Sequence, residues 1–263
     1  MSVLQGEEGS GRGRRSPRRP NPMSPRGVRA LGLFFILAAG LAGAQDEAAH
    51  AVRRKRMVET QIAARGVRDP RVLGAMAAVP RHLFVPAGSA DQAYEDHPLP
   101  IGEGQTISQP YIVAFMTERL ALGPGDKVLE VGTGSGYQAA VLARIAAEIY
   151  TVEIHDGLAR RAAALLERLG VRNVRVRAGD GFFGWPEAAP FDAVMVTAAA
   201  PEVPPALFAQ LKEGGRLILP LGDPRGFQVL TVVAKRGGKP VSKAVLDVRF
   251  VPMTGEIQKK KRP

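Results

Sequence analysis

Glycines at positions 132, 134 and 136 follow a short apolar run, and this arrangement constrains the fold more than any other part of the chain. The run Val128-Leu129-Glu130-Val131 predicts a buried strand, and residues 137–143 continue as an apolar helix. Glycine lets the backbone turn tightly and leaves its N–H groups open to a ligand. A strand, a glycine turn and a helix N-terminus predict a concave site for the polar end of a nucleotide-like molecule. A glycine-rich turn between a strand and a helix can also occur without a ligand, so the residues at the ends of the next strands are needed to distinguish the two cases.

Acidic residues stand at the ends of the next two expected strands. The strand over 149–153 ends at Glu153, and the strand over 173–177 is followed by Gly179-Asp180-Gly181. Because the carboxyl ends of parallel strands share one edge of a sheet, Glu153 is expected to face a ribose and Asp180 an adenine amino group. The G-x-G-x-G spacing, with Glu130 two residues ahead, resembles the first motif of S-adenosyl-L-methionine (AdoMet) methyltransferases. It differs from the G-x-G-x-x-G of dinucleotide sites. The resemblance implies AdoMet as the cofactor.

Alternating strands and helices predict an α/β fold, a doubly wound Rossmann-like sheet with helices on both faces. The expected strands cover 127–131, 149–153, 173–177, 191–196 and 216–220, and the helices between them cover 136–147, 156–169 and 204–211. Short helices over 58–65 and 71–78, an irregular loop over 80–100 and a helix over 110–122 should form an N-terminal helical cap. Segments 227–235 and 241–250 predict a closing antiparallel pair. The predicted parts are an extension (1–56), a cap with the acceptor motif (57–122), an AdoMet-binding core (123–256) and a basic tail (257–263).

The net charge of +11 belongs to the ends of the chain. Residues 1–44 carry seven arginines and two glutamates, and the blocks at 53–56 and 259–262 each add four positive charges. Together these three segments carry more positive charge than the net charge of the whole chain, so the catalytic body is near neutral. Such blocks are typical of solubilising tails and less often of tethers to nucleic acid or membrane. We therefore expect no nucleic-acid partner and no stable membrane association. We also expect a monomer, although the charge does not bear on this.

Residues 23–44 have the layout of a secretory signal peptide. Arg26 and Arg29 precede an apolar run over 30–41, and Ala42-Gly43-Ala44 is a small-x-small cleavage pattern. The run is too short for a transmembrane helix. The early basic block at 53–56 argues against export, as does a cofactor that is made in the cytoplasm. A start at Met57 would remove the segment. We expect a cytoplasmic protein, with periplasmic export as the alternative.

Several methyltransferase chemistries lack their usual residues in this chain. Methylases of exocyclic amino groups carry an Asn/Asp-Pro-Pro-aromatic run after the fourth strand, where this chain has Val-Thr-Ala-Ala-Ala-Pro over 196–201. Methylation of pyrimidine C5 needs a cysteine nucleophile, and the chain has no cysteine. Its four histidines show no paired metal-ligand spacing, which argues against a metal-dependent catechol-type enzyme. His97 is expected to serve a loop hydrogen bond.

One segment makes the resemblance specific. Its sequence is Gly102-Glu103-Gly104-Gln105-Thr106-Ile107-Ser108-Gln109-Pro110. It is similar to the stretch before the first sheet strand in the bacterial protein-L-isoaspartate O-methyltransferase family. The resemblance runs from about Met57 to Glu256. It includes Val-Pro-Arg over 79–81, the glycine turn, Gly-Asp-Gly over 179–181 and Val-Arg-Phe-Val-Pro over 248–252. Residues 1–56 depart from the usual bacterial pattern, which leaves localisation open but not activity.

The resemblance implies methyl transfer from AdoMet to the free α-carboxylate of an isoaspartyl residue in a damaged protein, with S-adenosyl-L-homocysteine (AdoHcy) as product. The methyl ester then closes to a succinimide, which begins repair. The implied catalytic residues are Ser108 and Thr106, and no metal is expected. The implied cofactor residues are Glu130, Gly132, Thr133, Gly134, Ser135, Gly136, Glu153, Asp180, Gly181 and Thr197. The implied substrate residues are Ile107, Gln109, Arg249 and Val251.

Alternatives remain at this point. Ser108 also suits a helix N-cap before residue 110, and Arg249 also suits a surface ion pair. Another AdoMet enzyme, acting on RNA or a small molecule, would fit the cofactor motif. An exported AdoMet-binding or protein-binding module without catalysis is the alternative from another class.

Overall fold

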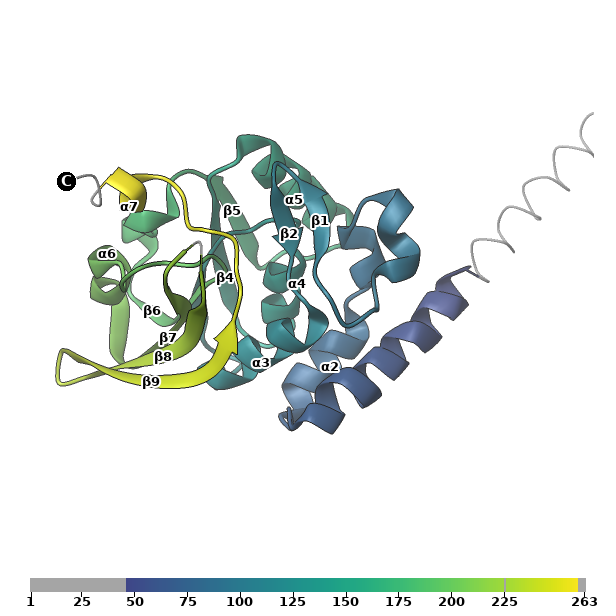
Figure 1. The fold of residues 1–263 in the computed structure, drawn as a ribbon, viewed down its shortest axis with the longest axis horizontal. Helices are drawn as coiled ribbons and strands as arrows, with labels where there is room; N and C mark the ends of the chain where they lie inside the picture. Colours follow the sequence, from purple (N-terminus) through teal and green to yellow (C-terminus); the bar gives the residue numbers. More distant parts are fainter. Residues whose placement is uncertain (1–45, 225, 260–263) are drawn as a thin grey trace, which may run out of the picture. The chain divides into compact units, whose positions relative to one another are not determined.

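The structure, a computed structural model, describes residues 46–224 and 226–259. From residue 48 onward, the described residues form one compact unit (Figure 1). The signal-like segment 23–44 and the charged residues 260–262 lie outside the described residues. Within the described part of the chain, no helix is both long and apolar enough to cross a bilayer.

A seven-stranded sheet in the order β5-β4-β3-β6-β7-β8-β9 forms the centre of this unit. The strands are β3 (Lys127–Val131), β4 (Glu148–Glu153), β5 (Val174–Ala178), β6 (Phe191–Val196), β7 (Leu211–Gly222), β8 (Gln228–Arg236) and β9 (Lys239–Val248). The first five run parallel, and β8 and β9 are antiparallel to their neighbours. The predicted doubly wound sheet and its closing antiparallel pair are confirmed.

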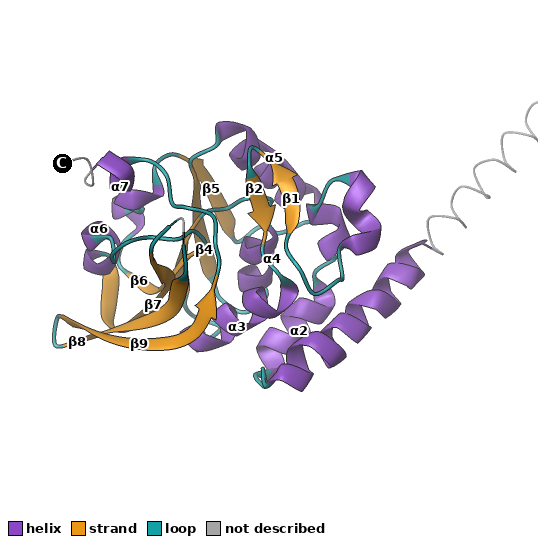
Figure 2. Ribbon diagram, viewed as in Figure 1, coloured by secondary structure: helices purple, strands orange, loops and turns teal. Residues whose placement is uncertain are grey.

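Helices cover both faces of the sheet (Figure 2). Along β3, Val128 packs into one apolar cluster, while Leu129 and Val131 pack into another. This alternation follows from the two-residue period of a strand. The first cluster includes residues of α2 (Pro70–Ala78), α3 (Pro110–Leu120), α4 (Tyr137–Ala143) and α5 (Asp156–Arg168). The second includes residues of α6 (Pro205–Ala209) and α7 (Glu256–Lys259).

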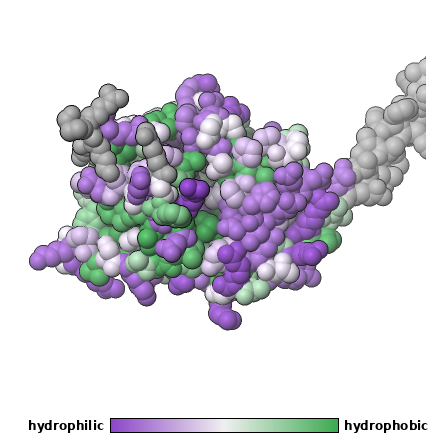
Figure 3. All heavy atoms as spheres, viewed as in Figure 1, coloured by the Kyte–Doolittle hydropathy of each residue, from purple (hydrophilic) through white to green (hydrophobic). Residues whose placement is uncertain are grey.

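The N-terminal helix of the unit begins earlier than the sequence predicted. Residues 48–57 are helical and continue into a wide π-type turn, Val58–Ile62, and a 3₁₀ turn, Ala63–Arg65. The helix ends at Gly66, whose φ of 93° is left-handed. Arg54 Nε donates to the carbonyl oxygen of Ala77 at 2.7 Å, and the helix presents a hydrophilic face (Figure 3). Residues 48–56, assigned from sequence to the extension, therefore belong to the folded unit.

Residues 80–107 contain more regular structure than expected. Two 3₁₀ helices, Arg81–Phe84 and Ala87–Gln92, lie where an irregular loop was predicted. A hairpin of β1 (Leu99–Gly102) and β2 (Gln105–Ile107) follows them. Its turn is tight, because Gly102, Glu103 and Gly104 all have positive φ. The hairpin carries the acceptor motif, and α3 begins directly after it. Further along, the helix expected over 204–211 is shorter, because residues from 211 onward join β7.

Candidate functional site

The glycine turn between β3 and α4 allows very close backbone approach. Gly132, Gly134 and Gly136 have φ of 99°, 55° and 88°, a region that favours glycine. A Cβ on Gly132 would lie 2.3 Å from Oγ1 of Thr197, so no larger residue fits there. The Thr197 hydroxyl donates to the carbonyl oxygens of Gly132 at 2.8 Å and Val131 at 3.1 Å. The end of β6 thus fixes the start of the turn.

Glu153 fixes the other side of the turn. One carboxylate oxygen accepts from the backbone N–H of Gly134 at 2.8 Å, and the other accepts from the N–H of His155 at 3.0 Å. The side chain therefore lies at the end of β4, as the sequence predicted, and against the glycine turn. Its contact with a ribose stays a prediction. Each oxygen keeps a second lone pair that a ligand hydroxyl can use.

A pocket opens at the carboxyl ends of β3, β4 and β6. Among the expected residues, it is lined by Thr106, Gly132, Gly134, Glu153, Gly181, Thr197 and Val251. A smaller cavity beside it is lined by Thr133, Ser135, Ile107 and Ser108. Gly136 lines neither of these cavities; it is the N-cap of α4, and a Cβ there would lie 3.3 Å from Cβ of Ala162.

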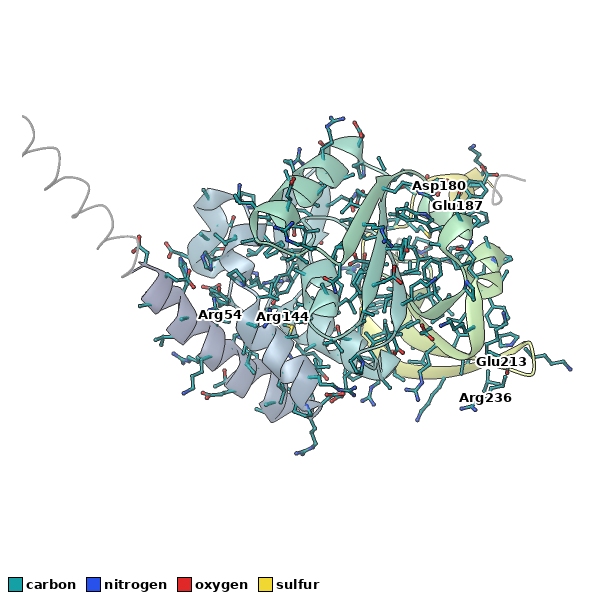
Figure 4. The ribbon with its side chains drawn as sticks, turned by 180° about the vertical axis from the view of Figure 1, so that it is seen from behind. Arg54, Arg144, Asp180, Glu187, Glu213 and Arg236 are labelled. Atoms are coloured by element: carbon teal, nitrogen blue, oxygen red, sulfur yellow. The ribbon has the colours of Figure 1, made fainter. Side chains whose placement is uncertain are left out.

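Asp180 lies at the expected sheet edge, but its carboxylate already has two protein donors. Its oxygens accept from the N–H groups of Phe182 at 2.9 Å and Glu256 at 2.7 Å. A Cβ on Gly255 would lie 2.4 Å from this carboxylate. Figure 4 shows Asp180 beside the C-terminal segment. Gly181, and not Asp180, lines the pocket, so a contact of the Asp180 carboxylate with adenine stays a prediction.

Glu130 lies behind the turn and lines neither of these two cavities, so its part in cofactor binding stays a prediction. It is fully buried on the side of β3 that also carries Val128. Oγ1 of Thr151 donates to its carboxyl group at 2.5 Å, and Thr151 Oγ1 is 2.6 Å from Thr133 Oγ1. Burial, with a smaller contribution from the charge of Glu153, raises the pKa of Glu130 to about 8. Glu130 therefore reaches the turn only through the two threonines.

A second pocket adjoins the first and contains the other acceptor-motif residues. It is lined by Thr106, Ser108, Gln109, Thr197, Arg249 and Val251, together with neighbours from the loop before β8 and the segment after β9. Thr106, Thr197, Val251 and Pro252 line both pockets. Apolar surface lies beside the end of β9 on this face (Figure 3). The two pockets are therefore adjacent, and a group could be transferred from a molecule bound in the first to a molecule bound in the second.

The structure supports neither the helix-cap role of Ser108 nor the surface ion pair of Arg249. The N-cap of α3 is Gln109, without a side-chain capping bond, and Ser108 precedes it. Within the described residues, the Ser108 hydroxyl has no hydrogen-bond partner, so Ser108 does not cap this helix. Arg249 forms no ion pair within the described residues; its guanidinium carbon lies 6.0 Å from the ring centroid of Phe227. Both side chains are available to a ligand.

Some pocket residues were not predicted from sequence. Gln105, Ile154, His155 and Met253 line the first pocket, and Gln105 Nε2 is 3.3 Å from His155 Nε2. Ile154 and His155 directly follow Glu153 at the sheet edge, so their position was a usable signal. His97 forms the expected loop hydrogen bond, with Nδ1 2.9 Å from the carbonyl oxygen of Pro98. The described residues contain no group of three or more side chains placed to hold a metal.

Comparison with known families matches residues 52–258 to the model described as protein-L-isoaspartate(D-aspartate) O-methyltransferase. A protein-L-isoaspartate O-methyltransferase of Opitutus terrae is 54% identical over 224 residues, covering 85% of this chain and 96% of the relative. One from Anaeromyxobacter sp. (strain Fw109-5) is 63% identical over 196 residues, covering 74% of this chain and 92% of the relative.

Solved structures agree with this match. A protein-L-isoaspartate O-methyltransferase structure superposes with a TM-score of 0.71 at 33% identity, covering 78% of this chain and 67% of that chain. A Plasmodium falciparum protein, proposed to be a protein-L-isoaspartate methyltransferase and crystallised with AdoHcy, gives a TM-score of 0.68 at 28% identity. That alignment covers 76% of this chain and 98% of the other.

Proposed function

Because this chain belongs to the protein-L-isoaspartate(D-aspartate) O-methyltransferase family, we infer that it transfers the methyl group of AdoMet to the free α-carboxylate of L-isoaspartyl residues in damaged proteins. The products are an α-methyl ester and AdoHcy. The ester then closes to a succinimide, and hydrolysis of the succinimide returns part of the residue to normal aspartate. The observation that carries the assignment to this site is the junction of the two pockets at Thr106 and Thr197.

The first pocket suits AdoMet, which supplies a sulfonium-activated methyl group. Backbone N–H groups of the 132–136 turn fit its methionine end, and the second lone pairs of the Glu153 carboxylate fit the ribose hydroxyls. Gly181 lines the pocket where the adenine would lie, and glycine is needed there for close packing, since a Cβ would lie 2.3 Å from Val131 Cγ1. We assign Thr133, Thr151 and Glu130 to the support of the turn. We assign Ser135 to the wall of the smaller cavity and Gly136 to the bend of the backbone before α4.

The second pocket suits a carboxylate held next to the transferred methyl group. A carboxylate is ionised at neutral pH, so the acceptor needs no general base. What the protein must supply is water exclusion and alignment. The hydroxyls of Ser108 and Thr106 are short donors at the pocket wall, and the start of α3 adds unpaired backbone N–H groups and a positive helix end. Ile107, Gln109, Arg249 and Val251 would contact the surrounding peptide.

The assignment is tested with two synthetic peptides that differ only at one residue, L-isoaspartyl in one and normal aspartyl in the other. The purified full-length protein with AdoMet should methylate the isoaspartyl peptide and leave the aspartyl peptide unlabelled. Equal labelling of both peptides would contradict the substrate assignment. Labelling of RNA alone would favour the RNA methyltransferase, and AdoMet binding without any methyl transfer would favour a binding module.

We further propose that the enzyme acts as a monomer in the cytoplasm, where AdoMet is made, without a nucleic-acid partner. The basic block 53–56 lies in the N-terminal helix of the folded unit, but residues 57–258 carry no net charge, which supports the absence of a nucleic-acid surface there. N-terminal sequencing of the native protein decides between this proposal and export, because cleavage after residue 44 would place the protein outside the cytoplasm. The division between a cap and a core at residue 122 stays a prediction.

A further inference from the structure

Arg81 is fully buried although it has no acidic partner. Its side chain has no exposed surface, and its Nη1 is a buried donor without a hydrogen-bond partner. Arginine is almost never fully buried unless it is paired. Within the described residues, no carboxylate lies within ion-pair distance of Arg81. A buried charge without a counter-ion is costly, so its retention needs a reason beyond packing.

The other nitrogens of Arg81 tie together two segments around the acceptor motif. Nε donates to the carbonyl oxygen of Ala93 at 2.7 Å, and Nη2 donates to the carbonyl oxygen of Ser108 at 2.7 Å. The guanidinium carbon also lies 4.8 Å from the ring centroid of Tyr137, the first residue of α4. One side chain therefore contacts both the acceptor loop and the helix that begins at the glycine turn.

Arg81 keeps its positive charge at neutral pH. Burial lowers its pKa to about 10, which is still well above 7. Burial also raises the pKa of the Tyr137 phenol to about 12, so the neighbouring ring stays neutral and offers no counter-charge. The positive end of α3 begins two residues after Ser108. The Arg81 guanidinium and the N-terminus of α3 are therefore two permanent sources of positive potential next to the Ser108 loop.

We propose that Arg81 is a positioning residue that holds Ser108 from behind and makes the acceptor pocket prefer a carboxylate to a neutral group of the same shape. This inference rests on the proposed acceptor role of Ser108. During transfer, the carboxylate oxygen forms a bond to the methyl carbon while the carbon–sulfur bond breaks, so negative charge on the acceptor and positive charge on sulfur both disappear. A fixed positive charge therefore favours the bound anion more than the transition state. Loss of the charge should raise KM more than it lowers kcat.

The test compares two peptides that differ at one group, the isoaspartyl α-carboxylate or its α-carboxamide. Binding of each to the full-length protein is measured by calorimetry in the presence of AdoHcy, along with AdoMet affinity and melting temperature. Wild type should prefer the carboxylate, and Arg81→Met should reduce this preference about tenfold, the order of magnitude for one poorly screened charge. Arg81→Lys keeps the charge without the planar fork. It should keep the preference and lower kcat.

Arg175→Met is the matched control. Its guanidinium carbon lies 5.0 Å from the ring centroid of Tyr150, but Arg175 pairs with Glu148 near the amino ends of β4 and β5, at the opposite sheet edge. This variant should keep the carboxylate preference and the peptide KM.

An equal loss of affinity for both peptides in Arg81→Met would overturn the proposal, because a structural defect does not distinguish charge. If Arg81→Met does not fold, loss of the preference in folded Arg81→Lys would overturn it as well. A wild-type protein that prefers the carboxylate peptide but never methylates it would contradict the proposed function while leaving the charge preference intact.

Discussion

The carboxylate of Glu153 accepts a hydrogen bond from the backbone N–H of Gly134 at 2.8 Å. This contact joins the end of β4 to the glycine turn, 19 residues earlier in the chain. The acid therefore has two tasks in the proposed site: it orders the turn, and it presents lone pairs to the ribose. Both tasks act on the cofactor rather than on the acceptor.

Replacement of Glu153 should weaken AdoMet binding. We expect Glu153→Ala to cost roughly 1–3 kcal/mol of binding free energy, the range for a lost buried polar partner. Calorimetric titration with AdoMet measures the change. Glu187→Ala is the control, because Glu187 pairs with Arg177 on the surface. Unchanged affinity in a folded Glu153→Ala protein would contradict the role assigned to this strand end.

Replacement of Ser108 should affect turnover rather than stability. Because the Ser108 side chain caps no helix, we expect Ser108→Ala to keep its melting temperature and its AdoMet affinity. Turnover of the isoaspartyl peptide should fall roughly 10- to 1000-fold, as for the loss of one positioned donor. Thr106→Ala shows how much the other hydroxyl of the loop contributes. A Ser108→Ala enzyme with normal turnover would shift the acceptor role to backbone donors and to Arg249.

A methyl group at Gly132 should abolish cofactor binding. The new Cβ would lie 2.3 Å from Thr197 Oγ1, and the φ of 99° is strained for any other residue. We expect Gly132→Ala to lose measurable AdoMet binding in an equilibrium assay. In Gly88→Ala the added Cβ meets no atom within 4 Å, and this variant should bind as wild type. Normal binding by Gly132→Ala would mean that the turn adopts another conformation.

Titration of Glu130 should make stability depend on pH. The folded-state pKa of about 8 lies above the ordinary value of 4.5, because burial disfavours the charged form. Between these values the folded protein holds a proton that the unfolded chain has lost, so this contribution to the free energy of unfolding is complete below pH 4.5 and declines toward pH 8. Between pH 5 and pH 8, the melting temperature of the wild-type protein should fall more than that of Glu130→Gln. Parallel melting profiles would contradict a raised pKa.

Strong local patterns were sufficient to predict the sheet and the edge that carries the pocket. The apolar run at 128–131 followed by glycines, and the acid at the end of 149–153, each had a single structural interpretation. The hairpin β1–β2 was not predicted, because its strands are only four and three residues long and include Pro100. Short strands of this kind carry little periodic signal.

Contacts between distant residues explain the other differences. The sequence gives no sign that Arg81 is buried, since its partners at Ala93 and Ser108 come from other segments. For Glu130, strand alternation already places the side chain on the face of Val128, under the helices. Its part in cofactor binding stays a prediction. The two donors to Asp180 come from residues 182 and 256, and the second of these is beyond local inference.

The segment after β9 completes the pocket. Ala199 N–H donates to Val251 O at 2.8 Å, Met253 N–H donates to Ala199 O at 2.8 Å, and Asp180 accepts from Glu256 N–H. Every other wall of the pocket is encoded earlier in the chain. During translation the glycine turn and the acceptor hairpin emerge from the ribosome well before residues 251–254. A chain that stops before residue 251 would therefore lack one wall of this pocket, together with the backbone contacts that the segment makes with Ala199 and Asp180.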